Sequence, residues 1–429
     1  MKRTWVVMRH ATPMMLAQLI PLASSFVIVS LALMLGRDDF VTVTGISATI
    51  VGLGALINVG VGIATLRDLA RTGDDPRGVA QALSWNLRVA SAISFVSLAV
   101  SLVTAVVLWL VLPEGSVARM GVVLAFLLQI PIYLISPHTS VLSSAFQHLD
   151  RERENFGITL SRSVVALGVG IVVVLLVDDD VIAIGLQAAV GSVMVGLMLA
   201  ERRRRLARSE VRFRVFPRPV FSGRAVWDRT VNSLDGAVFM LLFIVAQLIA
   251  ASISLEVGAQ VSAAVAFCRT VIIPLKMIGV TAGRMSLREP GLRSAFALSS
   301  ISATAMIVVP LALLLATLAF VGYSPLSGTV LTLLVAAQLL VEPCAGPLFS
   351  YLRVSFGARP GLAGLIITYV IVAPIVLMLC KFTLPTAVGI WICLLGARLL
   401  FAALTLLALR QGLRRALSGA STRVGGETT

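Results

Sequence analysis

Apolar stretches long enough to cross a membrane alternate with short polar segments along almost the whole chain. Runs such as "FVSLAVSLVTAVVLWLVL" and "AMIVVPLALLLATLAFV" match the length needed to span about 30 Å of hydrocarbon at about 1.5 Å per helical residue. The pattern predicts an all-α polytopic membrane protein with twelve transmembrane helices. Their predicted ranges are 11–35, 41–65, 83–112, 119–146, 157–177, 181–200, 225–250, 255–283, 294–321, 327–352, 362–380 and 386–410.

Basic residues are unevenly divided between alternate polar segments. If the N-terminus is cytoplasmic, the outer loops hold only Arg37, Arg119 and Lys381, together with the acidic run 178–180. The inner segments hold most of the other loop arginines, and cytoplasmic loops of membrane proteins collect Lys and Arg. We therefore expect a multi-pass protein of the plasma (inner) membrane with both termini in the cytoplasm.

The longest connection, residues 201–224, is rich in arginine and divides the spans six and six. We expect an N-terminal six-helix lobe over 1–200, a basic cytoplasmic linker over 201–224, a C-terminal six-helix lobe over 225–410 and a cytoplasmic tail over 411–429. The arginine run is typical of an orientation signal that also contacts anionic lipid.

Weak similarities recur in the same order in both halves. Thr65 and Thr281, for example, each precede an arginine by twelve residues, in loops that lead into new apolar spans. Parallel repeats related by a pseudo-two-fold axis along the membrane normal are typical of transporters, with a site between the lobes. The order of the matches predicts such a repeat here.

Composition supports lipid as the solvent. Of 429 residues, 58% are hydrophobic and 13% charged, with mean hydropathy +0.99, whereas soluble proteins carry about 25% charged residues. The net charge of +15 would suggest nucleic acid in a soluble protein, but here the basic loops explain it, and we expect no nucleic-acid partner. The first apolar run has no small-residue cleavage site, so no cleavable signal peptide is expected.

The sequence gives little support for a metal site, a disulfide framework or an enzyme active site. The four cysteines form no CxxC pair and the three histidines have no metal-ligand spacing, so we expect no metal or other cofactor. A membrane enzyme such as a polyprenyl-phosphate glycosyltransferase would need a carboxylate cluster or an acid/base pair in a sizeable loop. The loops are short and mainly basic, so we expect no enzyme. A non-catalytic membrane scaffold stays open if the buried charges are only structural.

Four ionisable residues fall inside predicted C-terminal spans at similar depth. Asp235 and Glu342 each lie about ten residues, or about 15 Å, from a predicted cytoplasmic helix end. Arg269 and Lys276 are seven residues apart on one predicted helix and share a face. Each such charge costs at least about 2.5–3.5 kcal/mol. They form either a structural salt-bridge cluster or, as we favour, a protonation or ion site with Glu342 and Asp235 as partners.

Two more polar residues lie inside apolar spans. His138, in "ISPHTS", is a second candidate for ion coupling, with a helix-kink packing role as the alternative. Arg398 lies within the last span, and the sequence suggests no partner for it.

Four stretches carry a family resemblance. They are "ATPMMLAQLIPLASSF…LMLGR", "GVGIATLRDLARTGDDPRGV", "GRAVWDRTVNSLDGAVFMLLF" and "QLLVEPCAGPLFSYLRVSFGARPG". They resemble the first, second, seventh and tenth spans of the multidrug and toxic compound extrusion (MATE) transporters, within the superfamily that also holds oligosaccharide-lipid and lipid II flippases. Asp235 and Glu342 fall where members often have an acid. The resemblance covers nearly the whole chain, although each motif is loose.

The resemblance implies a secondary exporter of small organic molecules, a drug or natural product, coupled to proton or sodium antiport by alternating access of two lobes. Two departures matter: Leu31 stands where many prokaryotic members have an aspartate, and Val354 replaces a glycine. Arg269 and Lys276 are unusual for a carrier of organic cations. A flippase for a lipid-linked oligosaccharide or polysaccharide precursor is therefore the alternative. We expect a monomer.

Overall fold

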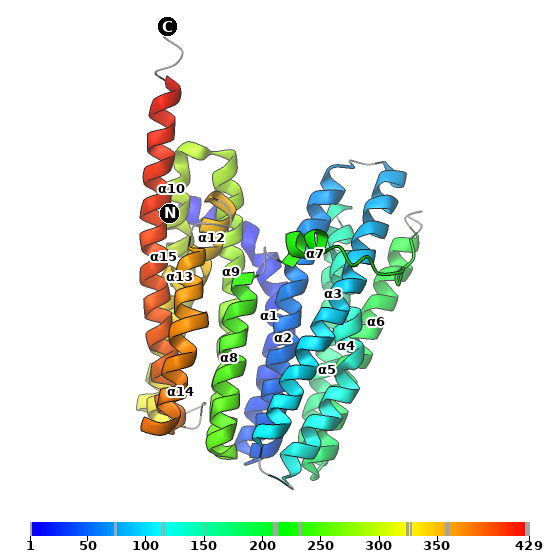
Figure 1. The fold of residues 1–429 in the computed structure, drawn as a ribbon, viewed down its shortest axis with the longest axis vertical. Coiled ribbons are helices and arrows are strands. Elements are labelled where there is room, and N and C mark those ends of the chain that lie inside the picture. Colours follow the sequence, from blue (N-terminus) through cyan, green and yellow to red (C-terminus); the bar gives the residue numbers. More distant parts are fainter. Residues whose placement is uncertain are drawn as a thin grey trace. The chain divides into compact units, whose positions relative to one another are not determined.

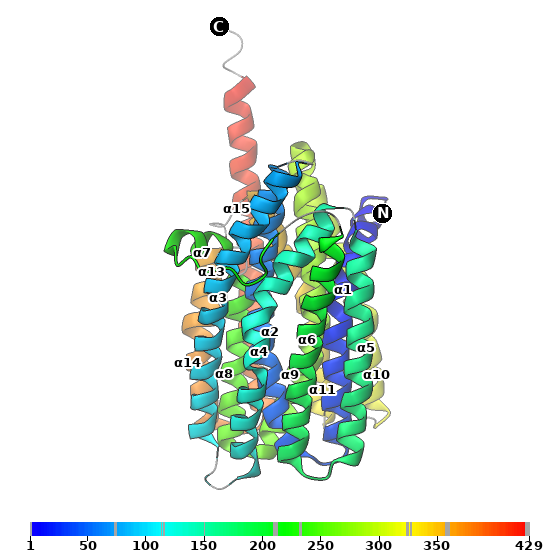
Figure 2. The ribbon, with the colours of Figure 1, turned by 90° about the vertical axis from the view of Figure 1, so that its right-hand side faces the viewer.

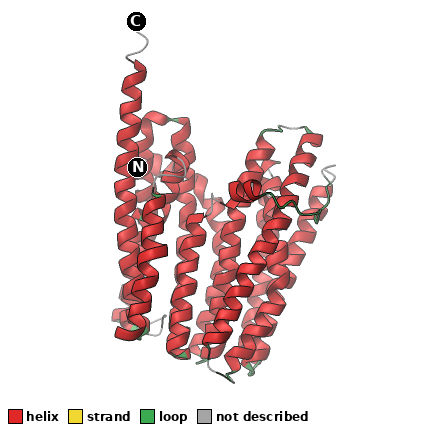
Figure 3. Cartoon of the chain, viewed as in Figure 1, coloured by secondary structure: helices red, strands yellow, loops and turns green. Residues whose placement is uncertain are grey.

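The computed structural model describes residues 2–424 except 73–74, 113, 115, 150, 209–212, 231–233, 323–325, 327 and 357–360. Every regular element in these ranges is helical, as Figure 3 shows. The first half contains α1 (Lys2–Met34), α2 (Asp38–Ala70), α3 (Pro76–Val111), α4 (Val117–His148), α5 (Glu152–Leu176), α6 (Asp180–Ala207) and the short α7 (Gly223–Thr230). The second half contains α8 (Leu234–Ile253), α9 (Leu255–Arg288), η2 (Pro290–Leu292), α10 (Arg293–Phe320), α11 (Thr329–Val341), η3 (Glu342–Cys344), α12 (Gly346–Phe356), α13 (Leu362–Leu365), η4 (Ile366–Val372), α14 (Ala373–Thr383) and α15 (Ala387–Val424) (Figure 1).

Within the described residues, nine helices are long and apolar enough to cross a membrane. A tenth is α1, whose segments Arg3–Pro13 and Gln18–Met34 meet at a bend of 67°. The remaining predicted spans correspond to α2, with 33 residues, and to α8, with the shorter apolar segment Ala237–Ile253. The chain is a multi-pass membrane protein.

Two of the predicted spans contain features that the apolar pattern does not show. The span predicted over 225–250 contains residues of α7 and of α8, and residues 231–233 between them lie outside the described part of the chain. The span predicted over 327–352 is confirmed as one apolar segment, Thr329–Phe356. Within it the α-helix is interrupted, since α11 ends at Val341 and α12 begins at Gly346.

The chain divides into two compact units that are not the halves of the sequence. Unit 1 comprises Met1–Leu22 and Phe267–Thr429, and unit 2 comprises Ala23–Ala266. The units follow packing rather than sequence similarity, so the predicted lobe boundaries and the internal repeat remain predictions.

Helix starts in unit 2 follow from capping residues. Asp75 accepts hydrogen bonds from the backbone N–H groups of Arg77 (3.1 Å) and Gly78 (2.9 Å) at the start of α3. Asp179 accepts from the N–H of Ile182 (2.9 Å) at the start of α6. These carboxylates satisfy N–H groups that have no partner within the helix, and they interact favourably with the helix dipole. The polar segments seen in the sequence thus set where helices begin.

The helices of unit 2 pack through small and polar residues as well as through apolar ones. α4 packs against α2, α3 and α6, and α5 lies beside α6 (Figure 2). Between α2 and α4, Ser144 donates to the carbonyl of Gly62 (3.0 Å) and Asn58 donates to Ser136 (2.8 Å). Small residues let membrane helices approach closely, and such hydrogen bonds hold them together.

In unit 1, α9 and α12 approach each other closely at two glycines of α9. A Cβ atom built on Gly279 would lie 1.8 Å from the carbonyl oxygen of Pro347, and one on Gly283 would lie 2.6 Å from Cβ of Val354. The spacing Gly279–Gly283 is the small-xxx-small pattern of tightly packed membrane helices. This contact fixes α12 against α9 just beyond the interruption at Glu342.

Candidate functional site

The interruption in unit 1 is centred on Glu342. The residue lies midway along the apolar segment Thr329–Phe356, in the short 3₁₀ turn η3. Pro343 follows it and lacks the N–H that would continue the α-helical ladder, and Pro347 lies one turn further on. The backbone therefore changes from α to 3₁₀ geometry at the depth where the carboxylate lies.

Glu342 forms a two-pronged ion pair with Arg398 of α15. Arg398 Nε donates to Glu342 Oε1 at 2.6 Å, and Nη2 donates to Oε2 at 2.5 Å. The exposed fraction of the side chain is 0% for Glu342 and 2% for Arg398. A guanidinium matches a carboxylate in this geometry, and charge-assisted bonds of this kind are the stronger ones. No partner for Arg398 could be predicted from the sequence, whereas the structure shows that it pairs with Glu342.

Tyr369 completes the coordination of the guanidinium. Arg398 Nη1 donates to the Tyr369 hydroxyl at 2.5 Å. Tyr369 lies in η4, a π-helical segment, and its ring packs against Phe401 at 4.8 Å between centroids. π-Helical segments are rare and often occur at functional sites. Here the segment faces α15 and turns Tyr369 onto Arg398.

Lys276 of α9 reaches the same place. A Cβ atom built on Gly346 would lie 3.1 Å from Arg398 Nη2, 3.3 Å from Glu342 Oε2 and 3.7 Å from Lys276 Cε. Three helical segments thus bring charged side chains together around Gly346, and Tyr369 of a fourth segment joins them through its bond to Arg398. We call Glu342, Arg398, Tyr369 and Lys276 the charged centre.

The other predicted site residues have different fates. Arg269 is buried in α9 with 1% exposure, as is Lys276 with 7%. Asp235 lies in the first turn of α8, but its side chain lies outside the part of the chain that the structure describes. Its partnership with Glu342 therefore stays a prediction. Glu342 and Lys276 are brought together, whereas the role predicted for Arg269 is untested.

His138 lies in unit 2, in contact with the predicted linker. Its Nδ1 lies 3.0 Å from the carbonyl of Leu134, and its Nε2 lies 3.0 Å from the Ser91 hydroxyl. Its ring packs on Phe216 at 4.8 Å between centroids, and Ser91 also donates to the carbonyl of Pro217. These contacts fit a packing role, and a coupling role for His138 stays a prediction.

The linker and the short helix α7 after it contain structural residues that the sequence did not reveal. Arg229 of α7 donates to Asp68 of α2 (3.0 Å) and Asn86 of α3 (3.1 Å), and Asn86 donates back to Asp68 (3.1 Å). This network holds α7 against α2 and α3. Arg202, in the arginine run, is also internal, since it donates to Asn155 at 2.8 Å.

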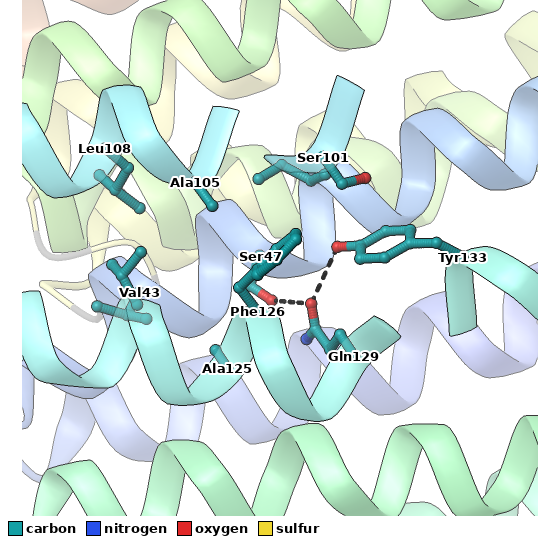
Figure 4. A pocket seen from close by; sticks show the side chains of 11 residues that line it. Val43, Ser47, Ser101, Ala105, Leu108, Ala125, Phe126, Gln129 and Tyr133 are labelled. Carbon is teal, nitrogen blue, oxygen red and sulfur yellow. Dashed lines mark hydrogen bonds between the residues drawn. The ribbon is translucent and has the colours of Figure 1, made fainter. Parts of the chain in front are cut away.

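Unit 2 contains a second polar site, shown in Figure 4. Ser47 of α2 and Tyr133 of α4 both donate to Gln129 Oε1, at 2.7 and 3.1 Å. Together with Ser101 of α3 they line a cavity of about 20 Å³, whose other walls are apolar. We call these four residues the polar pocket. The spacing of Gln129 and Tyr133, one helical turn apart, could have signalled it in the sequence.

Similarity to known proteins lies in the fold. Neither a protein-family model nor a curated protein sequence matches the chain. Among solved structures, a MATE in complex with MaL6 has a TM-score of 0.64 at 14% identity, over 97% of this chain and 96% of that one. The eukaryotic MATE transporter AtDTX14 has a TM-score of 0.59 at 16% identity, over 97% and 98%.

A third neighbour comes from Pyrococcus furiosus. It is a transporter of the MOP superfamily, described as having a binding pocket of reversed polarity that suggests a different function. Its TM-score is 0.61 at 15% identity, over 97% of this chain and 96% of that one. These likenesses confirm the predicted all-α, two-lobe fold, and the chain has the fold of the MATE transporters.

Proposed function

We propose that the protein is a secondary active exporter of small organic molecules and that Glu342 couples export to proton antiport. The observation that carries the proposal is the Glu342–Arg398 pair at an interrupted membrane helix. A buried charge of this kind costs several kcal/mol unless it is paired, so residues like it mark ion pathways by default. The fold shared with MATE transporters supports the same class of function.

The geometry favours a proton over sodium. Both oxygens of Glu342 already accept hydrogen bonds from Arg398. Lys276 Cε lies near Gly346, beside the same carboxylate. A sodium ion at Glu342 would meet two positive side chains, whereas a proton neutralises the carboxylate and needs no coordination shell. Protonation would remove the charge that holds Arg398. The pair and the helix interruption would then rearrange together.

Such a rearrangement can drive transport only if substrate and proton bind the two conformations unequally. We propose that the protonated and the ionised Glu342 favour different states of unit 1. Export would follow when substrate binding favours the state that proton binding disfavours. The antiport direction is an inference from the family resemblance.

The test uses purified full-length protein in liposomes with a pH-sensitive dye. A panel of amphiphilic cations and anions is added to wild type, to Glu342→Gln and to the matched control Glu256→Gln, an exposed glutamate at the start of α9. We expect a substrate-triggered proton signal in wild type and control that is lost in Glu342→Gln. A signal that persists in Glu342→Gln, or one that follows a sodium gradient alone, would refute proton coupling at this residue.

Loss of folding must be separated from loss of coupling. Glu342→Gln leaves Arg398 buried beside a neutral group, so the double variant Glu342→Gln/Arg398→Met is measured as well. Both variants are checked by size-exclusion chromatography and thermal unfolding before transport is assayed. Loss of the proton signal in a folded variant supports the proposal.

A flippase for lipid-linked saccharides is the second candidate. Unit 1 buries three cationic side chains, Arg269, Lys276 and Arg398, and lipid-linked saccharides carry phosphate. The Pyrococcus furiosus neighbour with reversed pocket polarity is a precedent for a different function on this fold. In the same liposomes, a fluorescent polyprenyl-diphosphate saccharide would become protected from a membrane-impermeant quencher if this candidate is right.

The membrane and orientation are also part of the proposal. The basic inner segments favour the plasma (inner) membrane, both termini in the cytoplasm and contact with anionic lipid at that face. Labelling by an impermeant thiol reagent of single cysteines placed at Ser116 and Thr422, in intact and broken cells, tests this. Ser116 should react in both and Thr422 only after the cells are broken.

A further inference from the structure

The polar pocket of unit 2 holds a hydrogen-bond donor that has no acceptor among the described residues. Gln129 Oε1 accepts two hydrogen bonds, from Ser47 and Tyr133. Within the described residues, its amide nitrogen donates none, and Gln129 is only partly buried. A primary amide nitrogen carries two N–H donors. Because neither N–H is bonded to another described residue, this nitrogen is suited to a ligand that brings an acceptor.

The pocket lies deep in the bundle. Ser47 is about 14 Å from the start of α2, and Ser101 is about 15 Å from the end of α3, by helical rise. Both helix ends lie at the same end of unit 2, since α2 and α3 are antiparallel neighbours. This depth is close to half the thickness of a bilayer core of about 30 Å. An acceptor for Gln129 must therefore be available near the middle of the membrane.

An apolar groove leads to the pocket from the lipid side. It has a volume of about 310 Å³ and runs between α3 and α4, with partly exposed residues such as Trp109 and Leu127 in its walls. The groove and the polar pocket share three residues, Ala105, Val122 and Phe126. The two spaces are therefore adjoining, and a molecule lying in the groove would have one end at the polar residues.

Charge and size restrict what that end can be. The residues lining the pocket and the groove include no ionisable side chain except Tyr133, so a phosphate or ammonium group would be buried without a counter-charge. The pocket volume of about 20 Å³ exceeds the roughly 10–15 Å³ that one water-sized group requires. A single hydroxyl or carbonyl group fits, whereas a phospholipid headgroup does not.

We infer that the α3–α4 groove and the polar pocket together form a lateral binding site for a single-chain, uncharged amphiphile. Its aliphatic chain lies in the groove, and its hydroxyl or carbonyl oxygen accepts a hydrogen bond from the Gln129 amide. Arg119, whose guanidinium lies 4.3 Å from the centroid of the Trp109 ring, adjoins the groove at the helix ends. A phospholipid would bind there with its phosphate at Arg119 and leave the pocket empty.

The experiment is photolabelling of purified full-length protein in lipid nanodiscs. The probe is a long-chain alcohol with a diazirine near the hydroxyl and a terminal alkyne, and labelled peptides are identified by mass spectrometry. The variants are Gln129→Leu, Ala105→Trp, which fills the junction of the two spaces, and the matched control Gln260→Leu. Gln260 lies on α9, and its amide is bonded to Glu256 in an exposed position. Hexadecanol and hexadecane serve as competitors.

We expect labelling to concentrate within residues 101–133. It should fall about five-fold or more in Gln129→Leu, the effect of about one hydrogen bond, and also in Ala105→Trp. Gln260→Leu should label like wild type, and hexadecanol should compete where hexadecane does not. Equal competition by hexadecane would mean an adventitious chain only. That result would overturn the inference. So would labelling spread over all lipid-facing helices, or labelling of Gln129→Leu at the wild-type level. If Ala105→Trp does not fold, Gln129→Leu and the two competitors decide the outcome.

Discussion

Unit 1 places an ion pair halfway along an apolar segment, whereas unit 2 places only neutral polar groups at comparable depth in its pocket. In the charged centre, both oxygens of Glu342 and all three guanidinium nitrogens of Arg398 are engaged, and neither side chain is more than 2% exposed. In the polar pocket, Gln129 keeps an amide nitrogen without a hydrogen bond among the described residues, beside a small cavity.

The difference shows that buried charged groups and buried neutral polar groups follow different rules in a membrane protein. An unpaired charge inside a membrane is very costly, and each guanidinium nitrogen of Arg398 donates a hydrogen bond within the protein. A neutral amide costs less, so an incomplete site can persist in the fold. Loss of one charge should therefore strongly destabilise the charged centre, whereas each single change in the polar pocket should cost no more than about one neutral hydrogen bond. The following predictions test that contrast, from the largest expected effect to the smallest.

Removing one member of the ion pair should have the largest effect. Arg398→Ala leaves Glu342 buried and uncompensated, and we expect a loss of about 3–5 kcal/mol in the free energy of unfolding. Thermal and denaturant unfolding in detergent would measure it. The double variant Glu342→Gln/Arg398→Met should recover most of the loss, because no unpaired charge remains. Equal losses in the single and double variants would show that packing, not charge, holds the centre together.

The close approach of α9 and α12 should be nearly as sensitive. Gly279→Ala places a Cβ 1.8 Å from the backbone oxygen of Pro347, which cannot rotate away, so we expect a loss of about 1–3 kcal/mol or more. Gly168→Ala on α5 is the matched control, since no atom lies within 4 Å of its Cβ. Unfolding midpoints of the two variants check this. A stable Gly279→Ala would mean that α12 can move away from α9, and the charged centre with it.

Each site contains one buried tyrosine, which permits a direct comparison of the two sites. Tyr369→Phe removes a hydrogen bond to a charged group and should cost about 1.5–3 kcal/mol, whereas Tyr133→Phe removes a neutral one and should cost about 0.5–1.5 kcal/mol. The measurement is the difference in unfolding free energy between these otherwise identical substitutions. If Tyr133→Phe is the more damaging, the polar pocket is the more tightly coupled of the two sites.

The smallest effect is expected at Ser47. Ser47→Ala removes one donor to Gln129 Oε1, but the Tyr133 hydroxyl still satisfies that oxygen. We expect a loss below about 1 kcal/mol, within the range of a single neutral hydrogen bond. Double-mutant analysis with Tyr133→Phe sharpens the point, because the pair should cost more than the sum of the single changes once Oε1 has neither donor. Strict additivity would show that the two donors act independently.

The helices and part of the charged centre could be predicted from the sequence. The apolar runs predict helices because lipid forces backbone groups to bond within the segment. Glu342 and Lys276 stood out because charges in such runs are rare. The pairing of Glu342 with Arg398 could not be predicted, since the two residues lie 56 positions apart and only tertiary packing joins them. The interruption after Val341 was signalled by Pro343, although proline is common in membrane helices and so specifies little alone.

Other features depended on polar contacts that no local pattern encodes. Arg229 lies in a sequence segment that leads into an apolar run, and only the structure shows its bonds to Asp68 and Asn86. The Gln129 site uses neutral residues, which occur throughout membrane helices and carry little signal individually. The buried charges could thus be identified from the sequence, whereas the Gln129 amide could not.

The π-helical segment η4 has a consequence for comparing this chain with others. A π turn encloses one residue more than an α turn, so it is equivalent to an insertion within an otherwise regular helix. Suppose that a relative has a regular α-helix in place of this π turn. A sequence alignment without a gap can then match the residues before Tyr369 or the residues after it, but not both. Beyond that point every side chain would be assigned to the wrong face. A superposition of backbones with a single-residue gap at η4 keeps both ends in register and shows what stands in the relative at the place of Tyr369.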